Sequence, residues 1–127
     1  VGGPLAIDES MEGQIQRETG RDARRLAGED RYETSQQVQS EIQADGASMK
    51  TLALATGLNF PDALAAGPAM ALLNRSFVLV DGARVHPRVQ DWVSRHADAI
   101  DELEVIGGPD AIADSVLRET AIAANGD

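Results

Sequence analysis

Glycine-containing turns occur at four points where a short apolar run gives way to a helix signal, and two of these turns, at 28–31 and 81–86, also contain an arginine. The four points are residues 28–31, 56–62, 81–86 and 107–110. Helix N-termini present free N–H groups that attract anions, and guanidinium groups bind carboxylates and phosphates through paired hydrogen bonds. The pattern therefore predicts an anion-binding site. The candidate ligand-binding residues are Arg25, Arg31, Tyr32, Thr56, Asn59, Asp62, Arg84, Gly107 and Gly108.

A simpler interpretation of the same residues stays open. The glycines can serve only to make tight turns, and the arginines can pair with nearby acids. Arg31 and Asp62 are one such pair, since both are expected at the same edge of a sheet. The sequence alone does not decide between ligand binding and internal pairing.

Motifs of the common enzyme classes are absent from the sequence. There is no Gly-x-Ser-x-Gly elbow, Walker loop or Gly-x-Gly-x-x-Gly, and there is no cysteine. His86 precedes a proline and is expected to cap a helix, while His96 is expected at the edge of the core. Acids within 98–104 are expected to form a solvated rim. We expect a non-enzyme without cofactor or metal, although a small α/β enzyme or phosphate-binding domain remains an alternative.

The overall charge narrows the choice of partners. Eleven basic residues stand against 21 acidic ones, for a net charge of −10. Nucleic acid is excluded as a partner because phosphate binding needs a basic surface. No apolar run is long enough to cross a bilayer, so membrane insertion is not expected either.

Apolar runs alternate with helix signals along most of the chain. Strands are predicted at 26–28, 50–55, 76–80 and 103–106, and helices at 4–20, 31–44, 61–73, 87–100 and 109–124. Such alternation is typical of an α/β fold in which helices flank a mostly parallel central sheet, with right-handed crossovers.

The predicted helices differ in how much of their surface is expected to be buried. Residues 63–73 are apolar or small on every side, which predicts a fully buried helix. Pro68 is expected to kink it or divide it in two, and its small residues allow another backbone to approach. In helix 31–44 the residues expected to face inward are Tyr32, Ser35, Val38 and Ile42.

An internal repeat divides the chain. Residues 1–11 read VGGPLAIDESM and residues 106–116 read IGGPDAIADSV, with six identities at one offset of 105 residues. A repeat of this length indicates duplication of a whole domain. Since the chain does not begin with Met, we expect a piece of a longer protein, with residues 1–20 as the C-terminal helix of a preceding repeat and 21–127 as one complete module.

Three stretches carry a resemblance to a known family. They are RLAGEDRYET at 25–34, ATGLNFPDALAA at 55–66 and LEVIGGPDAI at 103–112. In this order and spacing they resemble the motifs of the bacterial cell-wall-binding repeats of the second type. The resemblance covers residues 24 to about 120, and residues 1–15 resemble the end of a preceding copy.

The resemblance implies a secreted protein at the cell wall or cell surface. It implies a Toprim-like, Rossmann-like three-layer module that anchors an attached domain non-covalently through anionic cell-wall polymers. The expected further partners are sister repeats or identical chains, as a trimer or a dimer. A structural module that packs against its sisters without a ligand is the alternative. A Pro-Ile-Leu-Leu-like strand of the family has been linked to polymer binding, and the matching residues 76–79 read SFVL, without the proline.

Overall fold

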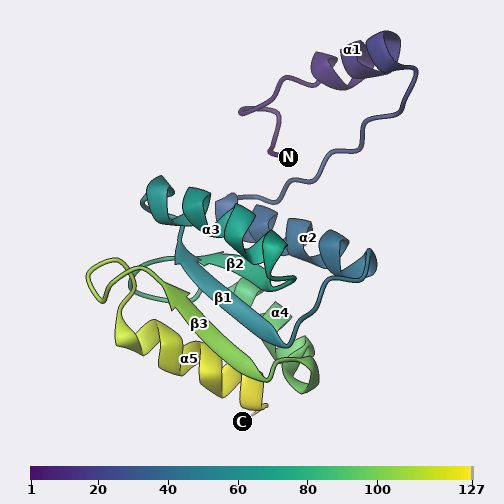
Figure 1. Cartoon of the computed structure of the whole chain (residues 1–127). Helices are drawn as coiled ribbons and strands as arrows, with labels where there is room; N and C mark the ends of the chain where they lie inside the picture. The colour runs from purple at the N-terminus through teal and green to yellow at the C-terminus, as the bar shows by residue number, and fades with distance from the viewer. Residues whose placement is uncertain (127) are drawn as a thin grey trace.

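The computed structural model describes residues 1–126 and contains a parallel sheet of three strands. The strands are β1 (Thr51–Thr56), β2 (Ser76–Val80) and β3 (Glu102–Ile106), in the spatial order β2-β1-β3. Leu52 of β1 is paired with Ser76 on one side and Leu103 on the other. The predicted α/β class with a parallel sheet and flanking helices is confirmed (Figure 1).

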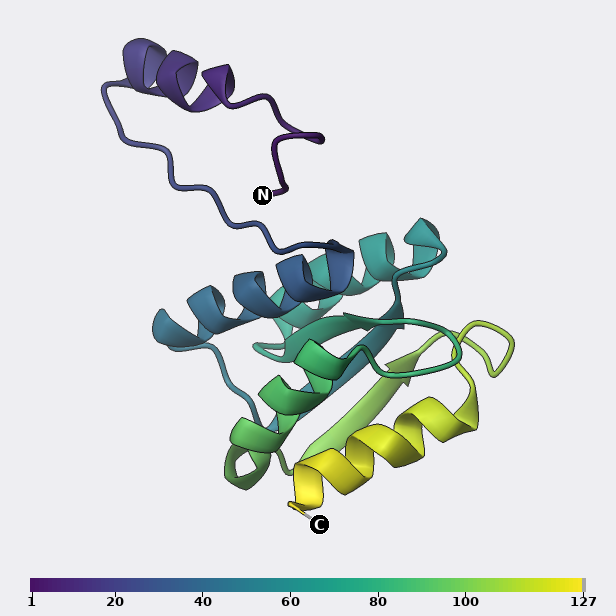
Figure 2. The same cartoon turned by 180° about the vertical axis from the view of Figure 1, so that it is seen from behind.

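Helices cover both faces of the sheet, but the two faces are packed differently (Figures 1 and 2). On one face, α4 (Pro87–Arg95) and α5 (Asp114–Asn125) pack against the larger residues of the strands. This core contains Leu52, Leu54, Val78, Val80, Val89, Trp92, Val93 and Val116, all at most 1% exposed. Since side chains alternate along a strand, Ala53 and Ala55 face the other way, toward α3 (Phe60–Leu72). The short helix η1 (Ala97–Ala99) links α4 to β3.

Helix α2 (Arg31–Ala44) lies along the outer edge of β2 and closes it. The amide of Phe77 donates to Gln39 Oε1 (2.9 Å), and the amide of Leu79 donates to Ser35 Oγ (3.0 Å). Gln39 is therefore the buried residue of α2, at 4% exposure, whereas Ile42, predicted to face inward, is 45% exposed. The prediction was wrong because an edge strand needs hydrogen-bond acceptors more than apolar contacts.

Several predicted boundaries differ from the structure. Residues 26–28 form no strand, so the described chain has three strands instead of four. The helices predicted to begin at Pro4 and Pro109 begin at Ser10 and Asp114. Each proline instead lies in a separate turn, and a new helix starts after it. The helix predicted to continue to residue 100 ends at Arg95, and η1 follows.

Helix α3 is continuous, and it is only partly buried. Pro68 lies inside it without dividing it in two. Both Pro68 and Leu64, whose carbonyl loses its helical donor, lie on the exposed side, where water can satisfy that carbonyl. Leu64 and Leu72 are 69% and 89% exposed, so the prediction of a fully buried helix was wrong. An apolar helix on the outside of a sheet leaves one apolar face uncovered.

The N-terminal segment extends from the body of the molecule. Helix α1 (Ser10–Thr19) buries none of its residues, and Figures 1 and 2 both show it away from the sheet. The chain before α1 turns back, so that residues 1–6 approach α2 and α3. Within residues 1–126 no helix is both long and apolar enough to cross a bilayer.

Candidate functional site

Three loops meet at the carboxyl edge of the sheet, which we define as residues 56–62, 81–86 and 107–113. The amide of Gly57 donates to Val80 O (2.8 Å), which joins the first loop to the end of β2. The amide of Ala113 donates to Gly82 O (2.8 Å), which joins the second loop to the third. A side chain on Gly107 would meet Asp62 Oδ2 at 3.2 Å, so the third loop also lies beside the start of α3. The loops therefore form one continuous surface.

The start of α2 completes this edge. Asp30 Oδ1 accepts hydrogen bonds from the amides of Tyr32 and Glu33, both at 2.9 Å, and so caps α2. Glu33 Oε2 accepts from the amide of Glu29 (2.7 Å), one residue before the cap. His86 caps α4 through its Nδ1, as predicted, and lies 3.1 Å through Nε2 from Asp30 Oδ2. The N-cap residue of α2 thus contacts the N-cap residue of α4.

Tyr32 lies at the centre of this arrangement. Its ring stacks on His86 with centroids 5.7 Å apart and planes 17° from parallel. A side chain on Gly57 would come within 2.7 Å of Tyr32 Cε1, so only glycine lets the β1 loop approach the ring this closely. Burial, followed by the negative charge of Asp81, raises the pKa of the Tyr32 hydroxyl above its ordinary value. Tyr32 is held mainly by packing, with its hydroxyl near an acid.

Arg31 is a candidate ligand residue that keeps most of its donors unused. Its Nη1 donates to Gly57 O (2.5 Å), and a guanidinium has five N–H donors. Within residues 1–126 it forms no ion pair, so the expected pairing with Asp62 is absent from the structure. Asn59 is the residue immediately before α3, and its exposed side chain makes no capping hydrogen bond. Both side chains are available for a ligand.

The structure does not bring all candidate residues together. Arg25 binds the N-terminal segment instead, through Glu12 (2.5 Å) and Gly2 O (2.7 Å). Thr56 is buried, and its hydroxyl accepts from the amide of Leu58 (3.2 Å). Arg84 is at the edge, with a side chain 79% exposed and 4.0 Å from Asp81. The candidates that lie at the edge are Arg31, Tyr32, Asn59, Asp62, Arg84, Gly107 and Gly108.

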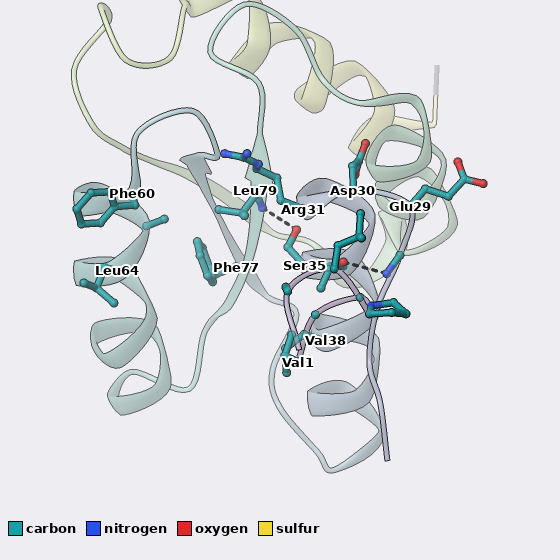
Figure 3. Close-up of a pocket in the computed structure, with 18 residues that line it drawn as sticks. Val1, Glu29, Asp30, Arg31, Ser35, Val38, Phe60, Leu64, Phe77 and Leu79 are labelled. Atoms are coloured by element: carbon teal, nitrogen blue, oxygen red, sulfur yellow. Dashed lines mark hydrogen bonds between the residues drawn. The ribbon is translucent and has the colours of Figure 1, made fainter. Parts of the chain in front are cut away.

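Sequence reasoning missed an apolar groove beside this edge. A cavity of about 800 Å³ lies between α2, α3, β2 and residues 1–6. Phe60 and Leu64 line it from α3, Val38 from α2, and Phe77 and Leu79 from β2 (Figure 3). The signal was present in the all-apolar sequence of α3, which was interpreted as burial within the module.

The comparisons with known proteins agree with this architecture. The family model for cell wall binding domain 2 (CWB2) matches residues 25–117. The chain belongs to this family. The match spans the module and begins after α1, so the recognised domain contains the sheet, the carboxyl edge and helices α2 to α4.

A solved structure shares the fold. Cwp8 from Clostridium difficile matches with a TM-score of 0.75 at 20% sequence identity. The match covers 99% of this chain and therefore includes the N-terminal segment, but only 20% of Cwp8. No match was found among curated proteins. Membership of the CWB2 family means that this domain binds the cell wall and acts at the cell wall or cell surface.

Proposed function

We propose that the carboxyl edge binds an anionic cell-wall polymer and thereby anchors a longer secreted protein to the wall without covalent attachment. The observation that carries the proposal is Arg31, whose guanidinium is held in place by Gly57 O and has no acidic partner within residues 1–126. A fixed, unpaired guanidinium can bind a phosphate or carboxylate through two hydrogen bonds. Asn59 and Arg84 add polar groups along the same edge.

The negative net charge of the protein limits how it can bind an anionic polymer. With a net charge of −10, long-range attraction to an anionic polymer is unfavourable. Binding therefore depends on direct contacts at the edge, where Arg31 contacts Gly57 O and Arg84 lies 4.0 Å from Asp81. We infer that the domain recognises a local group on the polymer and does not respond to overall charge density.

The module is proposed to be non-catalytic. CWB2 is a family of binding domains. His86 is occupied by capping α4 and by stacking on Tyr32, and His96 contacts Trp92 through its ring and through Trp92 O (2.8 Å). Both histidines therefore have structural roles.

Retention on purified bacterial cell walls tests the proposal. The protein should be retained on intact walls and lost from walls stripped of their anionic polymers. Arg31→Ala should weaken retention about tenfold, because a charge-assisted hydrogen bond contributes roughly 1.5–3 kcal/mol. The matched control is Arg95→Ala, an exposed arginine at the far end of α4, which should bind normally.

Two results would overturn the proposal. Equal retention on intact and stripped walls would exclude an anionic polymer as the ligand. Equal retention of the two arginine variants would remove Arg31 from the site. Fluorescence of the single tryptophan, Trp92, which is 1% exposed, verifies that both variants are folded.

A further inference from the structure

His86 joins the N-termini of α2 and α4 through both of its ring nitrogens. Its Nδ1 accepts a hydrogen bond from the amide of Arg88 (3.4 Å) and so caps α4. Its Nε2 lies 3.1 Å from Oδ2 of Asp30, whose other carboxylate oxygen caps α2. The ring also stacks on Tyr32. The side chain of His86 is 28% exposed, so protons from the solvent reach it.

The two contacts of the His86 ring determine where its proton lies. A backbone amide can only donate, so Nδ1 must offer its lone pair to the amide of Arg88. A carboxylate can only accept, so Nε2 must carry a proton toward Asp30. The hydrogen-bond network therefore assigns the neutral imidazole with its proton on Nε2. Neither the other neutral tautomer nor the charged ring satisfies both contacts.

Addition of a second proton to His86 breaks one of these contacts and strengthens the other. The charged ring has an N–H on Nδ1, which then faces the N–H of Arg88, so α4 loses its cap. The new positive charge also lies at the positive end of the α4 dipole, which disfavours it there. The hydrogen bond to Asp30, by contrast, becomes a contact between opposite charges. Protonation therefore keeps His86 bound to α2 and frees the start of α4.

Charged groups surround the His86 ring, but the ring differs from them in the pH at which it titrates. Asp30 contacts it directly, and Arg88 pairs with Glu33 (3.4 Å) and Glu29 (3.9 Å). The charged residues near the hydroxyl of the stacked Tyr32 are Asp30, Arg31, Asp81 and Arg84. Carboxylates and guanidinium groups ordinarily keep their charge between about pH 5 and 8, whereas a histidine ordinarily gains or loses a proton in this range. A change of pH within this range therefore acts on this part of the carboxyl edge through His86.

The second histidine of the chain does not share this sensitivity. His96 contacts Trp92 O through Nδ1 (2.8 Å), and a carbonyl oxygen can only accept. Nδ1 of His96 therefore carries a proton in the neutral and in the charged ring, and a second proton on Nε2 leaves the hydrogen bond in place. The same pH change breaks a contact at His86 and none of this kind at His96, which makes His96 the matched control.

We propose that His86 is a proton-sensitive joint of the carboxyl edge, whose protonation frees the start of α4 and loosens residues 81–86. Arg84 lies in this loop, so mildly acidic pH weakens the hold of the edge on its ligand. This consequence rests on the proposed binding of an anionic polymer. Its direction is diagnostic, because a protein of net charge −10 becomes less negative as the pH falls. Overall charge alone would then strengthen the attraction to an anionic polymer.

Nuclear magnetic resonance of the whole chain tests the joint itself. Imidazole nitrogen shifts at about pH 8 should show His86 with its proton on Nε2 and none on Nδ1. Between about pH 8 and 5.5, the protection of the Arg88 amide against hydrogen exchange, corrected for the intrinsic rate, should fall about fivefold. In His86→Asn this protection should not change, because asparagine caps a helix and does not titrate. A proton on Nδ1 at the higher pH, or an equal fall in His86→Asn, would overturn the proposal.

Retention on purified cell walls tests the consequence for binding. Between about pH 8 and 5.5 the natural chain should be retained about threefold less well, and His96→Asn should behave in the same way. His86→Asn should be retained equally well or better at the lower pH. Retention of the natural chain that is constant or rises, or that falls equally in His86→Asn, would overturn the coupling. Walls stripped of anionic polymers separate the two proposals: failure of polymer binding abolishes the difference between intact and stripped walls, whereas failure of the joint abolishes only the response to pH.

Discussion

Helices α1 and α5 follow the two copies of the Gly-Gly-Pro turn at nearly the same spacing, yet only α5 is part of a core. Val116, Thr120 and Ala123 of α5 are at most 5% exposed. Their counterparts in α1 include Met11 and Ile15, which are 41% and 40% exposed. The two regions begin with the same local structure and differ in what they pack against.

The difference separates local from tertiary contributions to a helix. Both segments contain the residues for a helix and an identical preceding turn, and both end in a glycine with positive φ, Gly20 or Gly126. A ten-residue helix is marginal in water without packing. Helix α5 has the sheet beneath it, whereas α1 is tied to the module mainly through Arg25.

Truncation of the first inward residue should show the largest contrast. Val116→Ala should lower the free energy of unfolding by about 2 kcal/mol, because it leaves a cavity in a closely packed core. The equivalent change in α1, Met11→Ala, should lower it by less than about 0.5 kcal/mol. Urea unfolding followed by Trp92 fluorescence measures both. Similar losses in the two variants would mean that α1 is packed as tightly as α5.

Substitution of the turn glycine should give a smaller contrast. Gly107→Ala should cost about 1 to 2 kcal/mol, because its φ of +123° disfavours a side chain and a Cβ would approach Ala111 Cβ to 3.2 Å. Gly2 has nearly the same φ, +120°, so Gly2→Ala is disfavoured in the same way. The turn around Gly2, however, can detach from the groove without unfolding the sheet. Its effect on urea unfolding should stay below about 0.5 kcal/mol. An equal loss would show that residues 1–6 unfold together with the module.

A change to alkaline pH should produce the smallest difference in stability between α1 and α5. The pKa of Tyr32 is raised in the folded state, so the folded state holds the phenol proton more tightly than the unfolded state does. The module therefore keeps its full stability below the ordinary tyrosine pKa of about 10 and loses some as the pH rises above it. The protection of α5 against hydrogen exchange, corrected for the intrinsic rate, should fall at that pH, whereas α1 buries none of its residues and has little protection to lose.

The single tyrosine makes this prediction directly measurable. Absorbance of the phenolate reports Tyr32 alone, and its midpoint should lie above the ordinary value. Asp81→Asn should move the midpoint back toward that value, because it removes a negative charge near the hydroxyl. A midpoint at the ordinary value in the natural chain would contradict the burial of the ring.

Much of the fold followed from local signals. Apolar runs located β1, β2 and β3, and the expected cap at His86, before a proline, marked the start of α4. The predicted strand at 26–28 failed because no neighbouring strand pairs with it, a matter that the three residues themselves cannot show. The meeting of the strand-end loops was predictable, since strand ends of a parallel sheet must lie at one edge, while ligand binding by those loops stays a prediction.

The residues that escaped prediction depend on partners distant in the sequence. Gln39 is a polar residue of α2, and nothing near it in the sequence indicates that it is buried. Its side-chain oxygen accepts a hydrogen bond from the amide of Phe77 in β2, 38 residues further along the chain. Arg25 looked like an anion ligand, but it binds Gly2 and Glu12. Polar side chains can satisfy their hydrogen bonds in many ways, and only the folded chain selects one.

The sequence by itself determined the alternation of strands and helices, the repeated turn and the family. These rest on local periodicity, caps and glycine positions, which act over a few residues. The tertiary structure alone decided which copy of the turn meets a groove, which apolar face of α3 stays uncovered, and that Arg25 is paired while Arg31 is not. Those outcomes depend on the distances between elements far apart in the chain, because burial and hydrogen bonding are properties of surroundings and not of the residue.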